Sequence, residues 1–140
     1  MTDIVSKRAA LQPTTAESIF TWFMRIVAAY CLLYGVLYWI RLIGFYPGQL
    51  FRFDLMPVHW QIAASALAVL FPFAAAGLWM LASWAPVIWF LCAAGEIAMY
   101  VGFPQYFGER WLIVFTHAAV ALIYVVLRLV IRLQKRQTPQ

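Results

Sequence analysis

Residues 86–104 read PVIWFLCAAGEIAMYVGFP, an apolar run with a single acidic residue and no basic one; the acidic residue, Glu96, lies near its middle. About 20 apolar residues suffice for a helix to cross a membrane, so the run has the length of a span. A carboxylate at that depth is costly to bury and needs a partner or a water-filled cavity. The stretch therefore predicts a helical membrane protein and makes Glu96 its most informative residue.

The composition of the whole chain also indicates a membrane protein. Of its 140 residues, 66% are hydrophobic and 11% are charged, whereas soluble domains have about 25% charged residues. The net charge of +5 comes mostly from basic residues towards the two ends of the chain, which is typical of residues that flank membrane segments. We expect no nucleic-acid partner, because no basic folded face is available for phosphate contacts.

Three further apolar segments complete the predicted fold, an all-α, integral membrane four-helix bundle. The predicted spans are residues 19–43, 58–82, 86–104 and 111–132 of a four-span domain at 14–133. A flexible cytoplasmic tail is expected at 1–13 and a basic cytoplasmic tail at 134–140. Four spans place both termini on one side, which carries seven of the ten basic residues. The positive-inside rule then predicts cytoplasmic termini.

Local signals predict where the helices begin and end. Thr14 and Glu17 have the spacing of a capping box at the start of the first helix, and Gly44 can end that helix. Asp54 is expected to cap the second span, and Ser83 the third.

Basic residues predict contacts with the lipid bilayer, the first expected partner. Arg25 and Arg41 bracket the first span at a separation of ~24 Å along a helix, slightly less than the hydrocarbon thickness. Both are therefore expected to anchor the helix by extending towards the interfaces. Lipid headgroups are the expected contacts of the last basic residues, Arg128, Arg132, Lys135 and Arg136.

A small polar cluster is predicted around Glu96. Counted from the nearer ends of their spans, Glu96 lies ~12 Å deep and His117 ~10 Å deep from the same side. Equal depth allows the two side chains to meet if their helix faces are opposed, and Tyr34 or Tyr100 could complete the cluster. Two interpretations stay open: an interhelical contact that fixes packing, or a proton-handling or quinone-facing site.

No other pattern indicates a cofactor or a metal. Cys31 and Cys92 lie in apolar segments without a CxxC or Cys/His arrangement. His59 and His117 lie at different depths, which disfavours a haem clamp. No nucleophile elbow, phosphate-binding loop or HExxH motif is present.

The sequence therefore predicts a small polytopic membrane protein that is not an enzyme. We expect it to act as an accessory or assembly component of a membrane complex, with other membrane proteins or further copies of itself as partners. The alternative is a membrane redox or proton-transfer module that uses Glu96 and His117.

Several blocks of the sequence carry a family resemblance. They are RLIGF at 41–45, FDLMPVHW at 53–60, GLW at 77–79 and SWAPVIW at 83–89, followed by Glu96. In these blocks the chain resembles a family of short four-span proteins of unknown function from the inner membranes of alphaproteobacteria. The resemblance implies a bacterial inner-membrane location and no activity. By span number and length the chain is also similar to DoxX-like proteins, which are linked to quinone or thiol redox systems.

Overall fold

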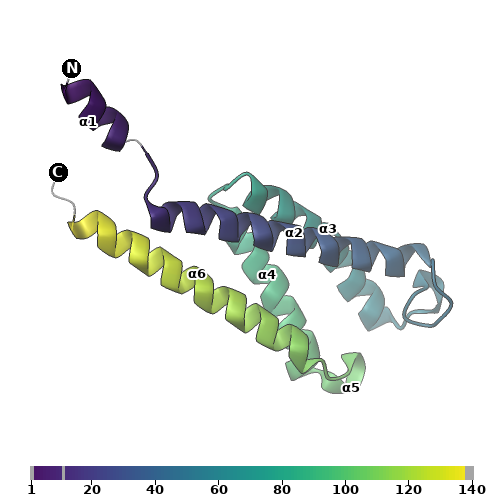
Figure 1. Cartoon of the computed structure of the whole chain (residues 1–140). Coiled ribbons are helices and arrows are strands. Elements are labelled where there is room, and N and C mark those ends of the chain that lie inside the picture. Colours follow the sequence, from purple (N-terminus) through teal and green to yellow (C-terminus); the bar gives the residue numbers. More distant parts are fainter. Residues whose placement is uncertain (1, 11, 138–140) are drawn as a thin grey trace.

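The structure is a computed structural model that describes residues 2–10 and 12–137 (Figure 1). In chain order its elements are α1 (Thr2–Ala10), α2 (Thr15–Ile43), the 3-10 helix η1 (Phe53–Leu55), α3 (Val58–Trp79), α4 (Ala85–Ile97), the π-helical turn η2 (Ala98–Gly102), α5 (Pro104–Phe107) and α6 (Trp111–Gln137). No strand occurs among the described residues. The predicted all-α fold class is confirmed over these ranges.

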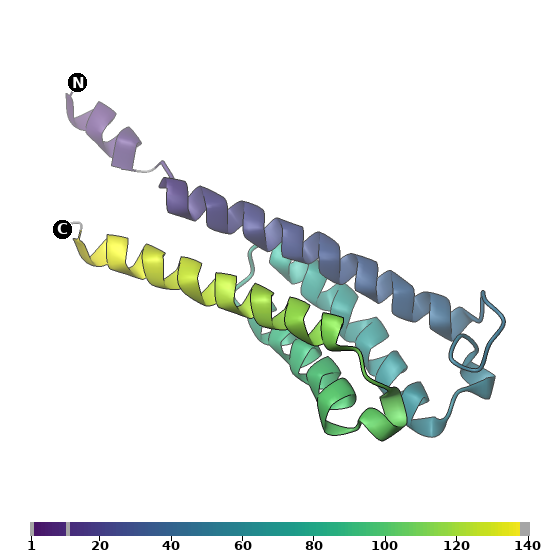
Figure 2. The same cartoon turned by 60° about the horizontal axis from the view of Figure 1, so that its bottom comes forward.

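Four helical segments are long and apolar enough to cross a membrane. They are α2, α3, the continuous segment Ala85–Gly102 formed by α4 and η2, and α6. The four predicted spans each correspond to one of them. The two ends of the chain lie at the same end of the molecule in both views (Figures 1 and 2), as an even number of spans requires. The cytoplasmic location of that end stays a prediction.

Helix α2 begins and ends at the predicted signals. The Thr14 side chain accepts a hydrogen bond from the Glu17 backbone N–H at 3.2 Å, and the Glu17 carboxylate accepts one from the Thr14 backbone N–H at 3.2 Å. At the other end Gly44 adopts a left-handed conformation with φ 78°, and its N–H donates to the Ile40 carbonyl at 3.3 Å. Both predictions are confirmed.

Two other predicted helix caps are wrong. Asp54 lies in η1, where its carboxylate pairs with the Arg52 guanidinium at 2.8 Å instead of capping α3. The N-cap position of α3 belongs to Pro57, which makes no side-chain cap. The N-cap position of α4 belongs to Trp84, one residue after the predicted Ser83, and it too lacks a side-chain hydrogen bond.

Helix α3 ends at Trp79, three residues earlier than the predicted span. Leu81 has a left-handed conformation with φ 57°. Its N–H donates to the Leu78 carbonyl at 3.2 Å, and the Ala82 N–H donates to the Gly77 carbonyl at 2.9 Å. These two bonds form a Schellman motif, which stops the helix. Leucine in this conformation costs roughly 1–2 kcal/mol.

The ends of the chain contain more helix than the sequence predicts. Residues 2–10 of the predicted flexible tail form α1, which projects away from the other helices (Figure 2). Asp3 in its first turn and Lys7 and Arg8 in its last turn suit the helix dipole. Helix α6 runs to Gln137, so residues 134–137 of the predicted basic tail are helical. Residues 1, 11 and 138–140 lie outside the described residues.

Helices α2 and α3 form the most extensive helix contact. Gly35 lies so close to α3 that a Cβ added to it would be 2.7 Å from the Pro72 Cγ atom. The Trp39 indole N–H donates to the Ala68 carbonyl at 2.9 Å across the same interface. Close approach at small residues is how membrane helices gain packing energy without a hydrophobic driving force.

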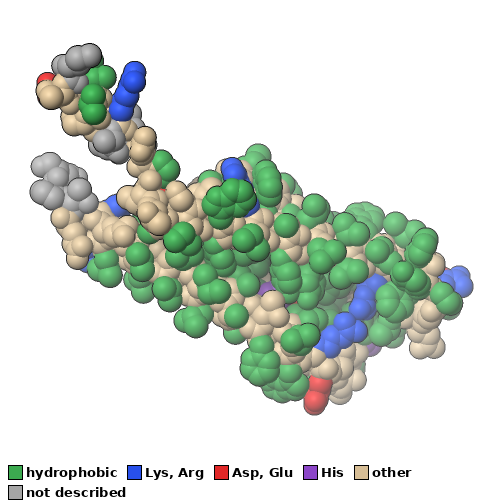
Figure 3. Space-filling view, in the orientation of Figure 1, with side chains coloured by type: hydrophobic (Ala, Val, Ile, Leu, Met, Phe, Trp, Pro, Cys, Tyr) green, Lys and Arg blue, Asp and Glu red, His purple; other side chains and the backbone are tan. Residues whose placement is uncertain are grey.

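The outward-facing surface is largely apolar. Figure 3 shows hydrophobic side chains spread over much of the visible face of the helices, with charged side chains mainly towards the ends. Large exposed side chains include Ile26, Leu33, Val69, Phe90 and Leu122. A soluble monomer rarely exposes so extensive an apolar surface, whereas helices surrounded by lipid require one.

Candidate functional site

Glu96 is the centre of a buried hydrogen-bond network that joins three helices. It lies on α4 and is fully buried. The Tyr38 hydroxyl of α2 donates to Glu96 Oε1 at 2.7 Å. Glu96 Oε2 lies 2.6 Å from the His117 Nε2 atom of α6. We call these three residues the Glu96 network.

The structure thus brings Glu96 and His117 together, the two residues that the sequence places at matching depth. His117 is 1% exposed, so the pair is shielded from lipid and water alike. The Trp89 ring packs edge-on against His117, with the ring centroids 6.1 Å apart. Two residues after Glu96, at Ala98, the helix widens into η2, and such π-helical turns are often found at functional sites.

The hydrogen bonds indicate where the protons of the network lie. The His117 Nδ1 atom is buried and has no hydrogen-bond partner among the described residues. Of the two neutral tautomers of histidine, the one with its proton on Nδ1 would leave an unpaired N–H at that position, which is more costly than a bare nitrogen lone pair. We therefore assign the histidine proton to Nε2, from which it is donated to the Glu96 carboxylate.

Tyr38 is the member that the sequence analysis missed. Tyr30, Tyr34 and Tyr38 lie on one face of α2 at helical spacing. Any of the three could reach a carboxylate on a neighbouring helix, and the sequence does not give the axial offset between α2 and α4. The repeated tyrosines were the available signal, and only the packed structure selects Tyr38.

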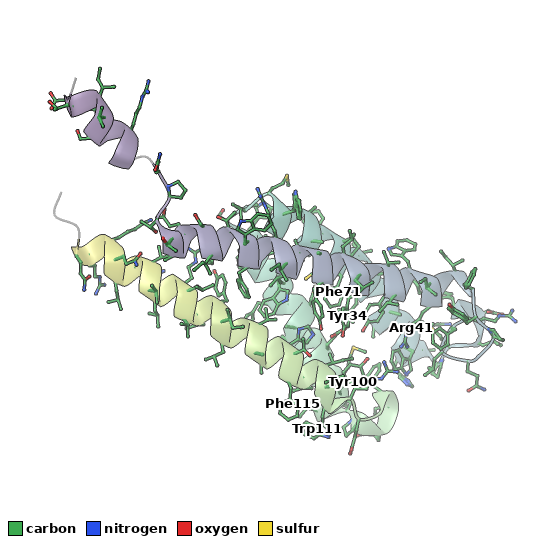
Figure 4. The ribbon with its side chains drawn as sticks, viewed as in Figure 1. Tyr34, Arg41, Phe71, Tyr100, Trp111 and Phe115 are labelled. Atoms are coloured by element: carbon green, nitrogen blue, oxygen red, sulfur yellow. The ribbon has the colours of Figure 1, made fainter. Side chains whose placement is uncertain are left out.

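Tyr34 and Tyr100, predicted members of the cluster, lie nearby without binding Glu96 among the described contacts. The Tyr34 ring packs against the rings of Tyr30 and Phe71, with centroid distances of 4.6 and 5.6 Å (Figure 4). Tyr100 lies in η2, is 3% exposed and is covered by the Arg110 guanidinium 5.8 Å from its ring centroid.

A cavity of about 370 Å³ adjoins the network at Tyr38. It is lined by residues from α2, η2, the residue before α6 and the first turn of α6: Tyr30, Leu33, Tyr34, Leu37, Tyr38, Arg41, Tyr100, Arg110 and Ile113. We call it the arginine cavity. Because Tyr38 both lines this cavity and binds Glu96, a molecule in the cavity would touch the network directly.

The predicted interface anchors rest against aromatic rings. The Arg25 guanidinium, in the first half of α2, lies 5.4 Å from the Trp79 ring centroid. Arg41, near the C-terminal end of α2, lies 5.1 Å from the ring centroid of Phe51 and 5.2 Å from that of Trp60. Cation–π contacts of this kind hold a guanidinium in place without a carboxylate.

The predicted lipid-headgroup residues lie on the last turns of α6. Contacts with other side chains hold Arg128 in position: its Nε–H donates to the Tyr124 hydroxyl at 3.2 Å, and its guanidinium covers the Phe20 ring. Arg132, Lys135 and Arg136 follow on the same helix. Their contact with lipid headgroups stays a prediction.

The remaining polar candidates lie apart from the Glu96 network. His59 is hydrogen-bonded to the Tyr106 carbonyl at 3.1 Å and packs against Phe107, beside α5. Cys31 and Cys92 are buried free thiols. Within residues 2–10 and 12–137, no three His, Cys, Asp or Glu side chains are grouped as metal ligands would be.

Comparison with known proteins agrees with the blocks of resemblance in the sequence. Neither the curated proteins nor the solved structures contain a match to the chain. A family model described as a family of unknown function, DUF6163, matches residues 18–135. This range is more than half of the chain, includes most or all of each candidate span and contains the whole Glu96 network, so the chain belongs to the DUF6163 family.

Proposed function

We propose that the protein is a non-catalytic accessory component of a membrane complex, and that α6 is the helix that binds its partner. The supporting observation is the unequal burial of the four candidate spans. In the most apolar part of α6, 6% of the residues are buried within the chain, against 28% in α2, 44% in α3 and 39% in Ala85–Gly102. His117 is the one buried residue described in α6.

The exposed side of α6 has the features of a helix–helix interface. Phe115, Ala118, Ala119 and Leu122 are all exposed and lie at helical spacing on one face. Two alanines side by side allow the backbone of a second helix to come close, and the larger residues on either side can pack around it. A transmembrane helix of another protein is the occupant that fits this face.

An apolar cavity beside α6 adds further unfilled contact surface. It has a volume of about 330 Å³ and is bounded by all four spans, with Phe23, Leu78, Trp89 and Val120 among its lining residues. Large side chains or lipid chains can fill such a cavity and gain dispersion energy. The cavity supports the idea that α6 packs more fully in a larger assembly.

In this proposal the Glu96 network has a structural role. It supplies the buried polar contact between α6 and the other helices, and its Tyr38 and His117 bonds occupy both carboxylate oxygens. We further propose a bacterial inner-membrane location with cytoplasmic termini, supported by the seven-to-three distribution of basic residues across the four spans.

Purification in a mild detergent, at the native expression level, tests the proposal. The tagged chain should elute with a fixed set of other membrane proteins in constant proportion. Replacing Ala118 and Ala119 by leucine should remove those proteins, because the added side chains block close helix approach. Ala66→Leu is the matched control, since Ala66 is an exposed alanine on α3. A lone monomer, or equal loss in the control, would contradict the proposal.

A second candidate function, a proton-transfer or quinone-facing module, is favoured by one observation. Tyr38 lines the arginine cavity and binds the Glu96–His117 pair, so a molecule bound there would lie beside a hydrogen-bonded chain of groups that can carry protons. The test is Glu96→Gln. A variant that stays folded, keeps its partners and loses the cellular phenotype would favour this chemistry over the structural role.

A further inference from the structure

Two arginines face the arginine cavity at the end of the molecule opposite the chain termini. Arg41 contributes from the last turns of α2, and Arg110 from the residue before α6. The two guanidinium groups are near enough to repel one another. Figure 3 shows neighbouring basic side chains in this part of the surface, and Figure 4 shows Arg41 and Tyr100 in the same region between α2 and the start of α6.

Neither arginine is in an ion pair among the described residues, although the more distant Glu96 carboxylate attracts Arg41. The ion pairs found there join Arg52 to Asp54 and His117 to Glu96. Arg41 is partly buried, whereas Arg110 is exposed. Two cations that face one cavity repel one another, most strongly where water is partly excluded, as at Arg41. An anion bound between them would remove the repulsion.

Aromatic rings, instead of carboxylates, position both guanidinium groups. Arg41 lies between the rings of Phe51 and Trp60, and Arg110 lies over the ring of Tyr100. A guanidinium stacked on a ring keeps its in-plane N–H donors available for a phosphate. The Arg41 Nη1 atom is in fact buried without a hydrogen-bond partner among the described residues.

Beyond the arginines, aliphatic side chains and tyrosine rings line the cavity. Leu33 and Leu37 of α2 and Ile113 of α6 line it, and Tyr30 marks its far end along α2. From Arg41 to Tyr30 the helix rises ~16 Å. The cavity thus has a cationic end and a wall of leucine side chains and tyrosine rings along α2, which can accommodate an amphiphile with an anionic head.

We propose that the arginine cavity binds an anionic phospholipid, with its phosphate on Arg41 and Arg110 and an acyl chain along the wall of leucine side chains and tyrosine rings. Both arginines lie at the ends of candidate spans, where lipid phosphates are found. The site is distinct from the predicted headgroup contacts at the C-terminal end of α6. It goes beyond the proposed accessory function, since it requires no protein partner.

Native mass spectrometry of the full chain in a neutral maltoside detergent tests this site. Dioctanoyl phosphatidylglycerol should bind as one molecule per chain, in preference to dioctanoyl phosphatidylcholine and to inorganic phosphate. The double variant Arg41→Gln, Arg110→Gln should weaken phosphatidylglycerol binding by roughly tenfold or more, because its charge-assisted hydrogen bonds are lost.

Arg25→Gln is the matched control, because Arg25 is stacked on Trp79 in the first half of α2 and does not line the arginine cavity; it should bind like the unchanged protein. If the double glutamine variant does not fold, Arg41→Lys with Arg110→Lys keeps both charges and should bind several-fold more weakly, since lysine lacks the planar donor fork. Equal binding of the two lipids, binding of inorganic phosphate without a lipid preference, or unchanged lipid affinity in the arginine variants would overturn the proposal.

Discussion

Replacing Glu96 by alanine should detach α6 from the other helices. The variant removes the acceptors of two buried hydrogen bonds, from Tyr38 at 2.7 Å and from His117 at 2.6 Å. It also leaves the Tyr38 hydroxyl and the His117 N–H without partners in a fully buried site. Since His117 is the one buried residue described in α6, only half-buried side chains of α6 remain to hold it against the core.

The size of the effect follows from the type of bond lost. Hydrogen bonds to a charged group contribute about 1.5–3 kcal/mol each in soluble proteins. Interhelical hydrogen bonds in membranes average only about 0.6 kcal/mol and reach about 1.7 kcal/mol. For two short, charge-assisted bonds and the cavity left by the side chain, we expect Glu96→Ala to lower the free energy of unfolding by about 3 kcal/mol.

Glu96→Gln should lower the free energy of unfolding by only about 1 kcal/mol, since glutamine can form hydrogen bonds with both Tyr38 and His117. The glutamine carbonyl can accept from Tyr38, and its amide can donate to His117 once the histidine proton moves to Nδ1. Both values can be measured by reversible unfolding in mixed micelles of lipid-like detergent and dodecyl sulfate, with tryptophan fluorescence as the signal.

Glu109→Ala is the control for this measurement. Glu109 is exposed and is in no ion pair among the described residues, so its replacement should change the free energy of unfolding by less than about 0.5 kcal/mol. If Glu96→Ala changes stability as little as Glu109→Ala, the reasoning about the Glu96 network is refuted.

Three further substitutions test the packing and the helix ends, each by the same unfolding assay. Gly35→Ala should lower the free energy of unfolding by about 1–3 kcal/mol, because the new Cβ would lie 2.7 Å from Pro72. Gly95→Ala is the control and should not destabilise the protein, because a Cβ added there has no neighbouring atom within 4 Å. Equal effects of the two substitutions would contradict the close contact at Gly35. Leu81→Gly should stabilise by about 1 kcal/mol by relieving a left-handed leucine, and a loss of stability would contradict the strain. Thr14→Ala should cost about 1 kcal/mol and expose the first turn of α2 to hydrogen exchange; unchanged exchange would show that the cap is unimportant.

Much of the fold follows from local patterns in the sequence. Apolar runs of membrane length give the four spans, and the capping box at Thr14 and the glycine at Gly44 give the ends of α2. The same kind of local reasoning fails where a competing interaction exists. Asp54 does not cap α3 because Arg52, two residues away, binds its carboxylate.

The candidate site is only partly readable from the sequence, for a geometric reason. Depth along a span can be counted from residue numbers, which is why Glu96 and His117 could be predicted to lie at similar depth in the membrane. Helix rotation and axial offset are set by packing between residues distant in sequence, such as Gly35 against Pro72. Tyr38 could therefore not be chosen over its neighbours on the same helix face.

The contribution of aromatic rings to the arginine cavity is likewise a property of packing. Phe51 and Trp60 come from the connector and from α3, and they meet Arg41 only in the folded chain. In the sequence Arg41 has the pattern of an ordinary interface anchor. The stacking leaves its donors available, and that feature distinguishes a binding residue from an anchor.

The central claim, that α6 binds a partner helix, is tested most directly by site-specific photo-cross-linking in cells. A photoreactive amino acid at Leu122 of α6 should give one cross-linked membrane protein, the same one that co-purifies in constant proportion. The cross-link should disappear when Ala118 and Ala119 are replaced by leucine. The control position is Ile62 of α3, whose side chain is 67% exposed, compared with 66% for Leu122. The photoreactive amino acid at Ile62 should give no cross-linked protein. Cross-links to lipid alone from Leu122, or the same products from both positions, would contradict the account.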